Sequence, residues 1–189
     1  QPEGTGEKFY AGNYRFGLSY ARHLTDRVTF GATCSYIAMS LYKGFSVGAV
    51  SVDIATMYIS DFRSFRFGMQ ISNFGSNIQY VNESYPLPTS FTFGFSLNAI
   101  EAETQTLLFS FSAVKPNEGR PLAQAGLEWN YSNTLFLRGG YRFGQAVANY
   151  SFGGGARANV EGYDLRIDYS YSNFLLLGAA NRFGIGVGL

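Results

Sequence analysis

Apolar and polar side chains alternate along most of this chain. In "FRFGMQIS" (65–72), "SFTFGFSLN" (90–98) and "YDLRIDYSY" (163–171), every second residue is apolar or aromatic, and most of the residues between them are small, polar or charged. Successive side chains of a β-strand point to opposite faces of its sheet, so a period of two residues predicts strands with one apolar face. No helical period competes with it.

Eleven such segments follow one another without a linker, a composition shift or an internal repeat. They predict one all-β domain over residues 1–189. Most segments are about 8–12 residues long, above the usual strand length of ~5–6. The predicted strands cover residues 13–22, 27–39, 47–59, 65–72, 90–99, 105–113, 123–131, 135–142, 150–160, 163–171 and 182–189.

The connections between these segments alternate in length. The short ones are 23–26, 60–64, 100–104, 132–134 and 161–162. The longer ones are 40–46, 73–89, 114–122, 143–149 and 172–181. Short turns at one end and long loops at the other are typical of outer-membrane β-barrels, whose tight turns are periplasmic and whose longer loops are extracellular.

Composition narrows the class of protein. Charged residues make up only 14% of the chain, against roughly 25% in a typical soluble protein, while aromatic residues make up 17%. No run approaches the ~20 consecutive apolar residues of a membrane-spanning helix. The 14 basic and 13 acidic residues give a net charge of +1, so bulk charge does not indicate nucleic acid as a partner.

Alternation alone does not say which face is wet, because a lipocalin or a β-sandwich alternates with its apolar residues inside. Three features favour apolar residues facing lipid. The aromatic side chains are too bulky in total for a small closed interior, and the polar face is mostly Gly, Ser, Thr and Asn with almost no Lys. Aromatic residues also gather near strand ends, as interfacial girdles do. These are Tyr10, Tyr14, Tyr20, Tyr58, Trp129, Tyr131, Tyr141, Tyr150, Tyr163 and Tyr171.

We therefore predict an antiparallel transmembrane β-barrel. In lipid every backbone hydrogen-bonding group must be paired, so the sheet is expected to close without edges. The last segment, "RFGIGVGL", reads as the closing strand, with its apolar residues toward lipid and its glycines inward. Many outer-membrane barrels end in a similar assembly signal, which Arg182, Gly184, Val187 and Leu189 fit.

If Leu189 is periplasmic, all five short turns become periplasmic and all longer loops extracellular. Residue 1 would then emerge outside the cell, because eleven is odd, whereas single-chain bacterial barrels have even strand numbers. We expect an odd number of strands before Gln1, in a longer chain or in another chain. No signal peptide precedes "QPEGTGE", which also suggests a processed chain or a fragment.

Several stretches resemble the PorV/PorQ family of bacterial outer-membrane barrels, relatives of the FadL long-chain fatty-acid transporters. They are "PEGTGEKFYAGNYRFGLSYARHLTDRVTFGATCSYI" (2–37), "FRFGMQISNFG" (65–75), "YPLPTSFTFGFSLN" (85–98) and "LRIDYSYSNFLLLGAANRFGIGVGL" (165–189). The resemblance implies a barrel of about 14 strands, of which this chain would be the C-terminal portion, lacking roughly the first three.

The resemblance also implies a location and a role. It places the chain in the bacterial outer membrane, in or near type IX secretion. PorV-like members collect cargo that carries a C-terminal domain and hand it to a surface attachment complex. The partners it implies are the lipid bilayer and either secreted cargo or a larger outer-membrane complex.

The inward face carries charged side chains that we expect to form a lumen polar network. Paired across strands, they would fill the lumen, and the alternative is a charged path for a solute. The core of this set is Arg66, Glu128, Arg138, Arg142, Arg157, Asp164, Arg166 and Asp168, and Arg15, Asp53 and Arg182 lie on the same face. Strand glycines on this face are expected to leave room for a plug from the missing N-terminal part.

Two loops are candidates for contact with a partner protein. The 73–89 loop is the longest, and its Asn and Pro residues argue against regular structure. The 172–181 loop carries an apolar patch, and such patches tend to mark interaction sites. The alternative is that both loops fold over the barrel mouth. The candidate residues are Tyr80, Tyr85, Leu87, Phe174, Leu175, Leu176 and Leu177.

Nothing in the sequence indicates catalysis, a metal or another cofactor. His23 is the only histidine, so the sequence gives no basis for a His-based metal cluster or a catalytic triad. Cys34 is the only cysteine and is expected to face lipid, and Trp129 is expected to be an interfacial anchor. We therefore expect a non-enzymatic barrel that binds partners through its loops. The alternatives are a FadL-like channel for hydrophobic or small solutes and a purely structural barrel.

Overall fold

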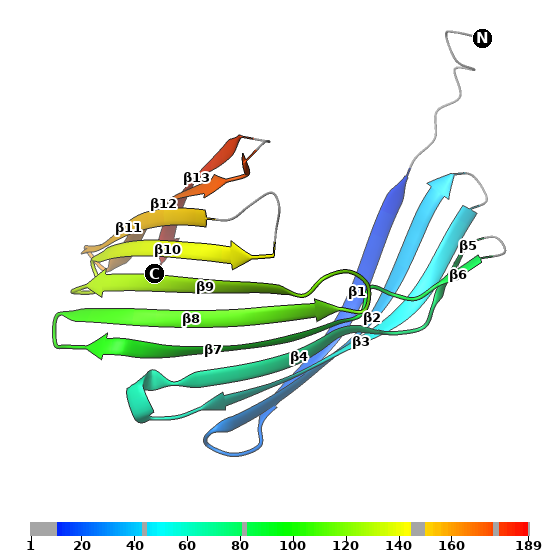
Figure 1. Ribbon diagram of the computed structural model, residues 1–189, viewed down its shortest axis with the longest axis horizontal. Coiled ribbons are helices and arrows are strands. Elements are labelled where there is room, and N and C mark those ends of the chain that lie inside the picture. The colour runs from blue at the N-terminus through cyan, green and yellow to red at the C-terminus, as the bar shows by residue number, and fades with distance from the viewer. Residues whose placement is uncertain (1–10, 43–44, 81–82, 145–149, 176–177, 189) are drawn as a thin grey trace, which may run out of the picture. The chain divides into compact units, whose positions relative to one another are not determined.

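The computed structural model describes residues 11–42, 45–80, 83–144, 150–175 and 178–188. These residues form antiparallel β-strands joined by turns and loops, with one 3-10 turn at Phe62–Ser64 (Figure 1). The prediction of an all-β antiparallel fold is confirmed. No helix in the described ranges is long and apolar enough to cross a membrane.

Eleven strands form one sheet in the order β1-β2-β3-β4-β7-β8-β9-β10-β11-β12-β13, and β5 and β6 form a separate hairpin. The strands are β1 Gly12–His23, β2 Val28–Tyr42, β3 Phe45–Ile59, β4 Arg66–Gly75, β5 Ile78–Tyr80, β6 Glu83–Tyr85, β7 Ser90–Glu101, β8 Gln105–Pro116, β9 Leu122–Tyr131, β10 Leu135–Phe143, β11 Tyr150–Val160, β12 Tyr163–Asn173 and β13 Ala179–Gly188.

The described chain has 13 strands, whereas the sequence predicted about 11. The two additional strands, β5 and β6, lie in the 73–89 loop, for which we had expected no regular structure. Three-residue strands are too short to produce a periodic signal in the sequence. The eleven predicted strands all occur, within a few residues of the expected bounds.

The last strand begins at Ala179 rather than at Arg182. Its ladder with β12 runs on through the pairs Tyr171↔Asn181, Ser172↔Ala180 and Asn173↔Ala179. These alanines carry little strand propensity of their own, so the pairing with β12 decides the boundary. The 172–181 loop is correspondingly shorter than predicted.

Closure into a barrel is not established by this sheet. The strand order runs from β1 to β13 and does not return to β1 within the described residues. The coarser prediction, one antiparallel sheet of long neighbouring strands, is what the fold confirms.

The chain divides into two compact units that share strands β3, β4, β7 and β8. Unit 1 comprises residues 1–56, 70–91 and 116–118, and unit 2 comprises residues 57–69, 92–115 and 119–189.

In unit 1, β1 and β2 pair along their whole length, from Gly12↔Ser40 to His23↔Thr29. One face of β1 carries four large apolar or aromatic residues that are all exposed, and the opposite face carries Arg15 and small residues. The exposed residues are Tyr14, Phe16, Leu18 and Tyr20. The alternation predicted for this segment therefore appears as two chemically distinct faces of the sheet.

Unit 1 also contains a small buried cluster formed by Ala49, Ile78 and Leu87. Ile78 belongs to β5 and Leu87 to the segment after β6, while Ala49 belongs to β3. Part of the loop therefore packs against the sheet. Three half-buried residues of β2 and β3 complete the cluster: Ile37, Met39 and Val47.

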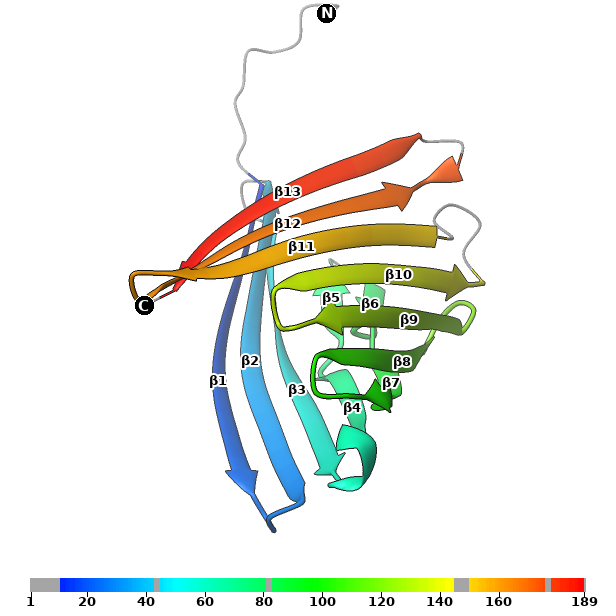
Figure 2. The ribbon, with the colours of Figure 1, turned by 90° about the vertical axis from the view of Figure 1, so that its left-hand side faces the viewer.

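In unit 2, strands β8 to β13 lie side by side in chain order (Figures 1 and 2). The apolar face carries cross-strand aromatic contacts. Phe152 stacks on Tyr171 with ring centroids 5.4 Å apart, and Tyr169 lies 5.0 Å from Phe183. Such pairs contribute about 0.2–1 kcal/mol each to sheet stability.

Several short turns of unit 2 use left-handed backbone conformations. Ser132 and Asn133 have φ of 50° and 53°, and Glu161 and Gly162 have φ of 53° and 90°. Two consecutive left-handed residues form the type I′ turn, whose twist matches that of the strands it joins. Asn and Gly tolerate this conformation, so these turns hold their hairpins in register.

Candidate functional site

The polar face of unit 2 is defined here as the face of β9–β13 that carries Glu128, Arg138 and Arg182. Arg138 on β10 is its central ion-paired residue. Its Nε donates a hydrogen bond to Glu128 Oε2 on β9 at 2.6 Å, and its Nη1 donates to Asp168 Oδ1 on β12 at 2.7 Å. The guanidinium also lies over the ring of Phe136, 5.3 Å from its centroid. One side chain thus ties together three strands.

The Arg138–Asp168 pair spans an intervening strand, and glycine makes this possible. On β11, Gly153 lies opposite Arg138 and Gly155 lies opposite Asp168. A Cβ added at Gly155 would lie 2.6 Å from Asp168 Oδ1, closer than such atoms approach. The absent side chain therefore leaves the space that the ion pair occupies.

Two further ion pairs extend the network. Arg166 Nε donates to Asp168 Oδ2 at 2.5 Å, so Asp168 accepts from two arginines. Arg157 on β11 pairs with Asp164 on β12 through two hydrogen bonds. These side chains are a third to a half exposed, so each pair stabilises the fold only slightly. Their main consequence is to hold the charges of the polar face in fixed positions.

The charges of this face do not balance. Within the described residues of β9–β13, five arginines accompany three carboxylates. The carboxylates are all engaged by Arg138, Arg157 or Arg166. Arg142 and Arg182 form no ion pair in the described part of the chain. Of the predicted polar network, the structure brings together Glu128, Arg138, Arg157, Asp164, Arg166 and Asp168 as ion pairs.

The remaining predicted network residue, Arg66, is exposed at the start of β4 and has no ion pair among the described residues. In unit 1, Arg15 Nη2 donates to Asp53 Oδ2 at 2.9 Å. Sequence reasoning placed these two on the same face as the network, but it did not identify Phe136, because an aromatic residue at a polar-face position interrupts the alternation.

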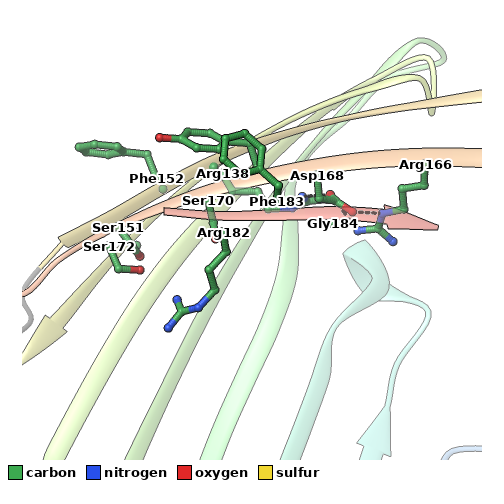
Figure 3. A pocket seen from close by; sticks show the side chains of 14 residues that line it. Arg138, Ser151, Phe152, Arg166, Asp168, Ser170, Ser172, Arg182, Phe183 and Gly184 are labelled. Carbon is green, nitrogen blue, oxygen red and sulfur yellow. Dashed lines mark hydrogen bonds and ion pairs between the residues drawn. The ribbon is translucent and has the colours of Figure 1, made fainter. Parts of the chain in front are cut away.

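A cavity of about 570 Å³ opens beside the Arg138 cluster. Figure 3 shows Arg182, Ser170, Ser151 and Ser172 on one side of the strands and Phe152 and Phe183 on the other. The polar part of its lining consists of Arg138, Arg166, Asp168, Arg182 and three serines, with Gly140, Gly153 and Gly184 between them. The charged groups of the lining are three guanidinium groups and one carboxylate, beside an apolar surface that includes Phe152 and Phe183.

The start of the 73–89 loop is held by the Asp53 carboxylate. Asn73 has a left-handed φ of 55°, and its backbone N–H donates to Asp53 Oδ1 at 2.7 Å. Asn73 Nδ2 donates to Pro88 O at 3.3 Å, and Thr89 Oγ1 donates to Asn73 O at 2.9 Å. The two ends of the loop are thus hydrogen-bonded to each other and to β3.

The predicted partner-binding residues differ in exposure. Tyr85 is 50% exposed, whereas Leu87 is 3% exposed and belongs to the buried cluster. Leu87 is thus a packing residue of its loop, because its side chain joins Ile78 and Ala49 rather than standing free. Two residues of β2, Ile37 and Met39, could have indicated this packing from the sequence. Both are apolar residues at positions that alternation assigns to the polar face, and they mark where the loop packs.

Tyr85 is also hydrogen-bonded within its hairpin. Its hydroxyl donates to a carboxylate oxygen of Glu83, and this hydrogen bond raises the pKa of Tyr85 above its usual range. Its exposed ring offers apolar area with one polar end, as aromatic residues at interfaces do.

In the 172–181 loop, Leu175 is 43% exposed and has a left-handed φ of 49°. Phe174 is half-buried. Leu176, Leu177 and the side chain of Tyr80 lie outside the described residues. In β13, which the sequence predicted as a closing strand, Gly184 and Arg182 lie opposite Asp168 and Ser170 of β12, and Val187 is exposed on the apolar face. Leu189 lies outside the described residues.

The histidine and the cysteine both lie in the hairpin formed by β1 and β2. His23 Nδ1 lies 2.9 Å from Thr29 Oγ1, and Cys34 is an exposed free thiol opposite Leu18. No group of three metal-ligating side chains occurs within the described ranges.

No protein-family model matches this sequence, and no curated protein matches it.

Proposed function

We propose that this chain is part of the wall of a bacterial outer-membrane β-barrel, of the PorV/PorQ type that its sequence resembles. Its role is to bind a protein partner through the loops at one end of its strands. The partner is a secreted cargo protein or a larger outer-membrane complex. The role is non-catalytic and requires no cofactor.

The observation that carries the membrane part of this proposal is the exposed apolar face. Leu18 and Ile185 are each 82% exposed, and the described residues bury only three hydrophobic side chains. Covering one large apolar side chain contributes about 1.5–3 kcal/mol. Lipid supplies that cover for a whole face of long strands, and a closed barrel would remove the free edges.

Strand length supports the same proposal. The shortest strand of the large sheet, β10, has 9 residues, and β2 and β3 have 15 each. A tilted transmembrane strand needs about 9–11 residues. Every strand of the large sheet is long enough, and the longest ones would extend beyond the hydrocarbon.

Partner binding rests on exposed apolar side chains near strand ends that lead into loops. Tyr85 and Leu175 are of this kind, and Phe74 at the end of β4 is exposed as well. Such side chains gain free energy when a partner covers them. The ion-paired polar face, by contrast, has most of its charges already compensated.

The first experiment tests membrane assembly and partner contact together. A photo-crosslinking amino acid is introduced at Tyr85 and, separately, at Leu175, in cells that make the protein natively. We expect the protein in the outer-membrane fraction, with heat-modifiable migration, and a discrete crosslinked protein from both positions. The matched control position is Ile185 on the apolar face, which should crosslink only to lipid.

Recovery of the protein in the soluble fraction would contradict the barrel proposal. Outer-membrane recovery without a crosslinked protein from either loop position would contradict the partner-binding role while leaving the barrel in place.

A second candidate function is a FadL-like channel for hydrophobic or small solutes. The cavity beside Arg138, whose lining has three arginines and one carboxylate, is the observation that favours it. Solute flux into vesicles that contain the purified protein tests this candidate, and an absence of flux would contradict it.

A further inference from the structure

We propose that the polar face of unit 2 binds an oxyanion, a carboxylate or phosphate group, at Arg182. The site lies at the loop end of β10–β13. It does not depend on partner binding by the loops, and its test has a different readout.

The first element of the site is a row of small residues across six strands. Backbone register aligns Ser110, Gly126, Gly140, Ser151, Ser172 and Ala180 on β8 to β13. Cβ and Oγ are the largest extensions of these side chains. The row therefore forms a shallow trough on an otherwise polar, arginine-bearing face.

The second element is Arg182, in the adjacent register row. Arg182 lies opposite Ser170, which lies opposite Gly153, which in turn lies opposite Arg138. Figure 3 shows the Arg182 guanidinium on the same side of the strands as Ser151, Ser170 and Ser172. It forms no ion pair within the described part of the chain, so its donors are free to meet a ligand.

The third element is Ser172, which points to a ligand independently of Arg182. Its side chain lines the same cavity and is only 9% exposed. Its hydroxyl forms no hydrogen bond with any described residue. The unpaired hydroxyl can donate a hydrogen bond to a ligand oxygen.

The charges decide the class of ligand. Asp168 is the only carboxylate in the cavity lining, and it already accepts hydrogen bonds from Arg138 and Arg166. The lining therefore offers no unpaired carboxylate to a cation, whereas the unpaired guanidinium of Arg182 can bind an anion. The planar fork of guanidinium donors matches two oxygens of a carboxylate or phosphate, and serine hydroxyls supply further donors.

The cavity volume of about 570 Å³ exceeds the volume of a bare ion. Ligand pockets of ~300–1,000 Å³ hold small organic molecules. The oxyanion is therefore either a free ion or the head group of a molecule with an apolar part that would lie along the trough.

The test is calorimetric titration of the folded, full-length protein in zwitterionic detergent with two probes, inorganic phosphate and monohexyl phosphate. The variants are R182Q, R182K and S172A. The matched control is R157Q, which removes one positive charge from the same face but from the Arg157–Asp164 pair outside this cavity lining. Circular dichroism checks that each variant keeps its strands.

We expect R182Q to weaken binding about tenfold or more, because a charge-assisted hydrogen bond is lost. R182K should retain part of the affinity, since lysine keeps the positive charge but lacks the planar set of N–H donors of a guanidinium. S172A should weaken binding by about two- to tenfold. R157Q should change it less than twofold.

Binding of both probes with this pattern supports a site for a free ion. Binding of monohexyl phosphate alone, with the same sensitivity to R182Q, supports a site for a head group with an apolar part. Failure of both probes to bind, an equal loss in R157Q and R182Q, or unchanged binding in S172A would overturn the proposed site.

Discussion

At the scale of single residues, the absence of a side chain matters as much as its presence. Gly155 lies between Arg138 and Asp168, and its missing Cβ leaves room for their ion pair. The sequence places both charged residues and the glycine on one face by alternation. It does not indicate that the pair crosses a strand, because that depends on the register of three strands.

We predict that Gly155→Ala destabilises the fold by about 1–3 kcal/mol, the usual cost of overpacking. The new Cβ would meet Asp168 Oδ1 and Ile167 O. The matched control is Gly139→Ala on β10, where an added Cβ meets nothing within 4 Å. Urea unfolding in lipid vesicles measures both, and equal effects of the two substitutions would refute the steric role of Gly155.

Asp53 is the second residue whose role appears only in three dimensions. One of its carboxylate oxygens accepts a hydrogen bond from the Arg15 guanidinium on β1, and the other accepts one from the backbone N–H of Asn73. Losing a hydrogen bond to a charged acceptor costs about 1.5–3 kcal/mol, so we predict that Asp53→Ala accelerates hydrogen exchange of the Asn73 amide about tenfold or more. Unchanged exchange at Asn73 would show that Asp53 does not hold the loop.

At the scale of elements, strands and tight turns follow local rules, and the long loop does not. Period-two patterning locates every long strand, and Asn133 and Gly162 mark two of the left-handed turns. The β5–β6 hairpin was not predicted. It forms because Ile78 and Leu87 pack on residues of β2 and β3, such as Ile37 and Ala49, that are distant in the sequence.

We predict that Leu87→Ala opens this loop. Leu87 is almost fully buried, and Leu→Ala in a core costs about 2–5 kcal/mol. The folded variant should be cleaved by thermolysin between residues 76 and 89, a region that we expect to resist cleavage in the unaltered protein. Tyr85→Ala, at a half-exposed position in the same loop, is the control and should leave the cleavage rate unchanged. Resistance of Leu87→Ala to the protease would contradict the packing role of Leu87.

At the scale of the whole molecule, the decisive property is the chemical difference between the two faces of one sheet. Apolar and aromatic residues stand exposed on one face, while arginines, carboxylates and small residues occupy the other. Covering the apolar face would stabilise such a sheet. The outer-membrane proposal rests on this exposed apolar face.

We predict that a charge is tolerated on one face of β13 and not on the other. Ile185→Lys should destabilise the membrane-inserted protein by about 2–4 kcal/mol if it lies near the bilayer midplane. Its neighbour Gly184, where an added Cβ makes only ordinary contact with Asp168, is the matched position. Gly184→Lys should be much milder in refolding titrations into vesicles. Similar costs at both positions would exclude a lipid-facing Ile185.

The sequence by itself determined the all-β class, the strand positions and the chemistry of each face, because alternation is a local property with a period of two residues. Only the tertiary structure decided which charges pair, where the long loop packs and which arginines have no carboxylate partner. Those depend on register between strands and on packing between distant segments, and a one-residue shift in register would change every one of them.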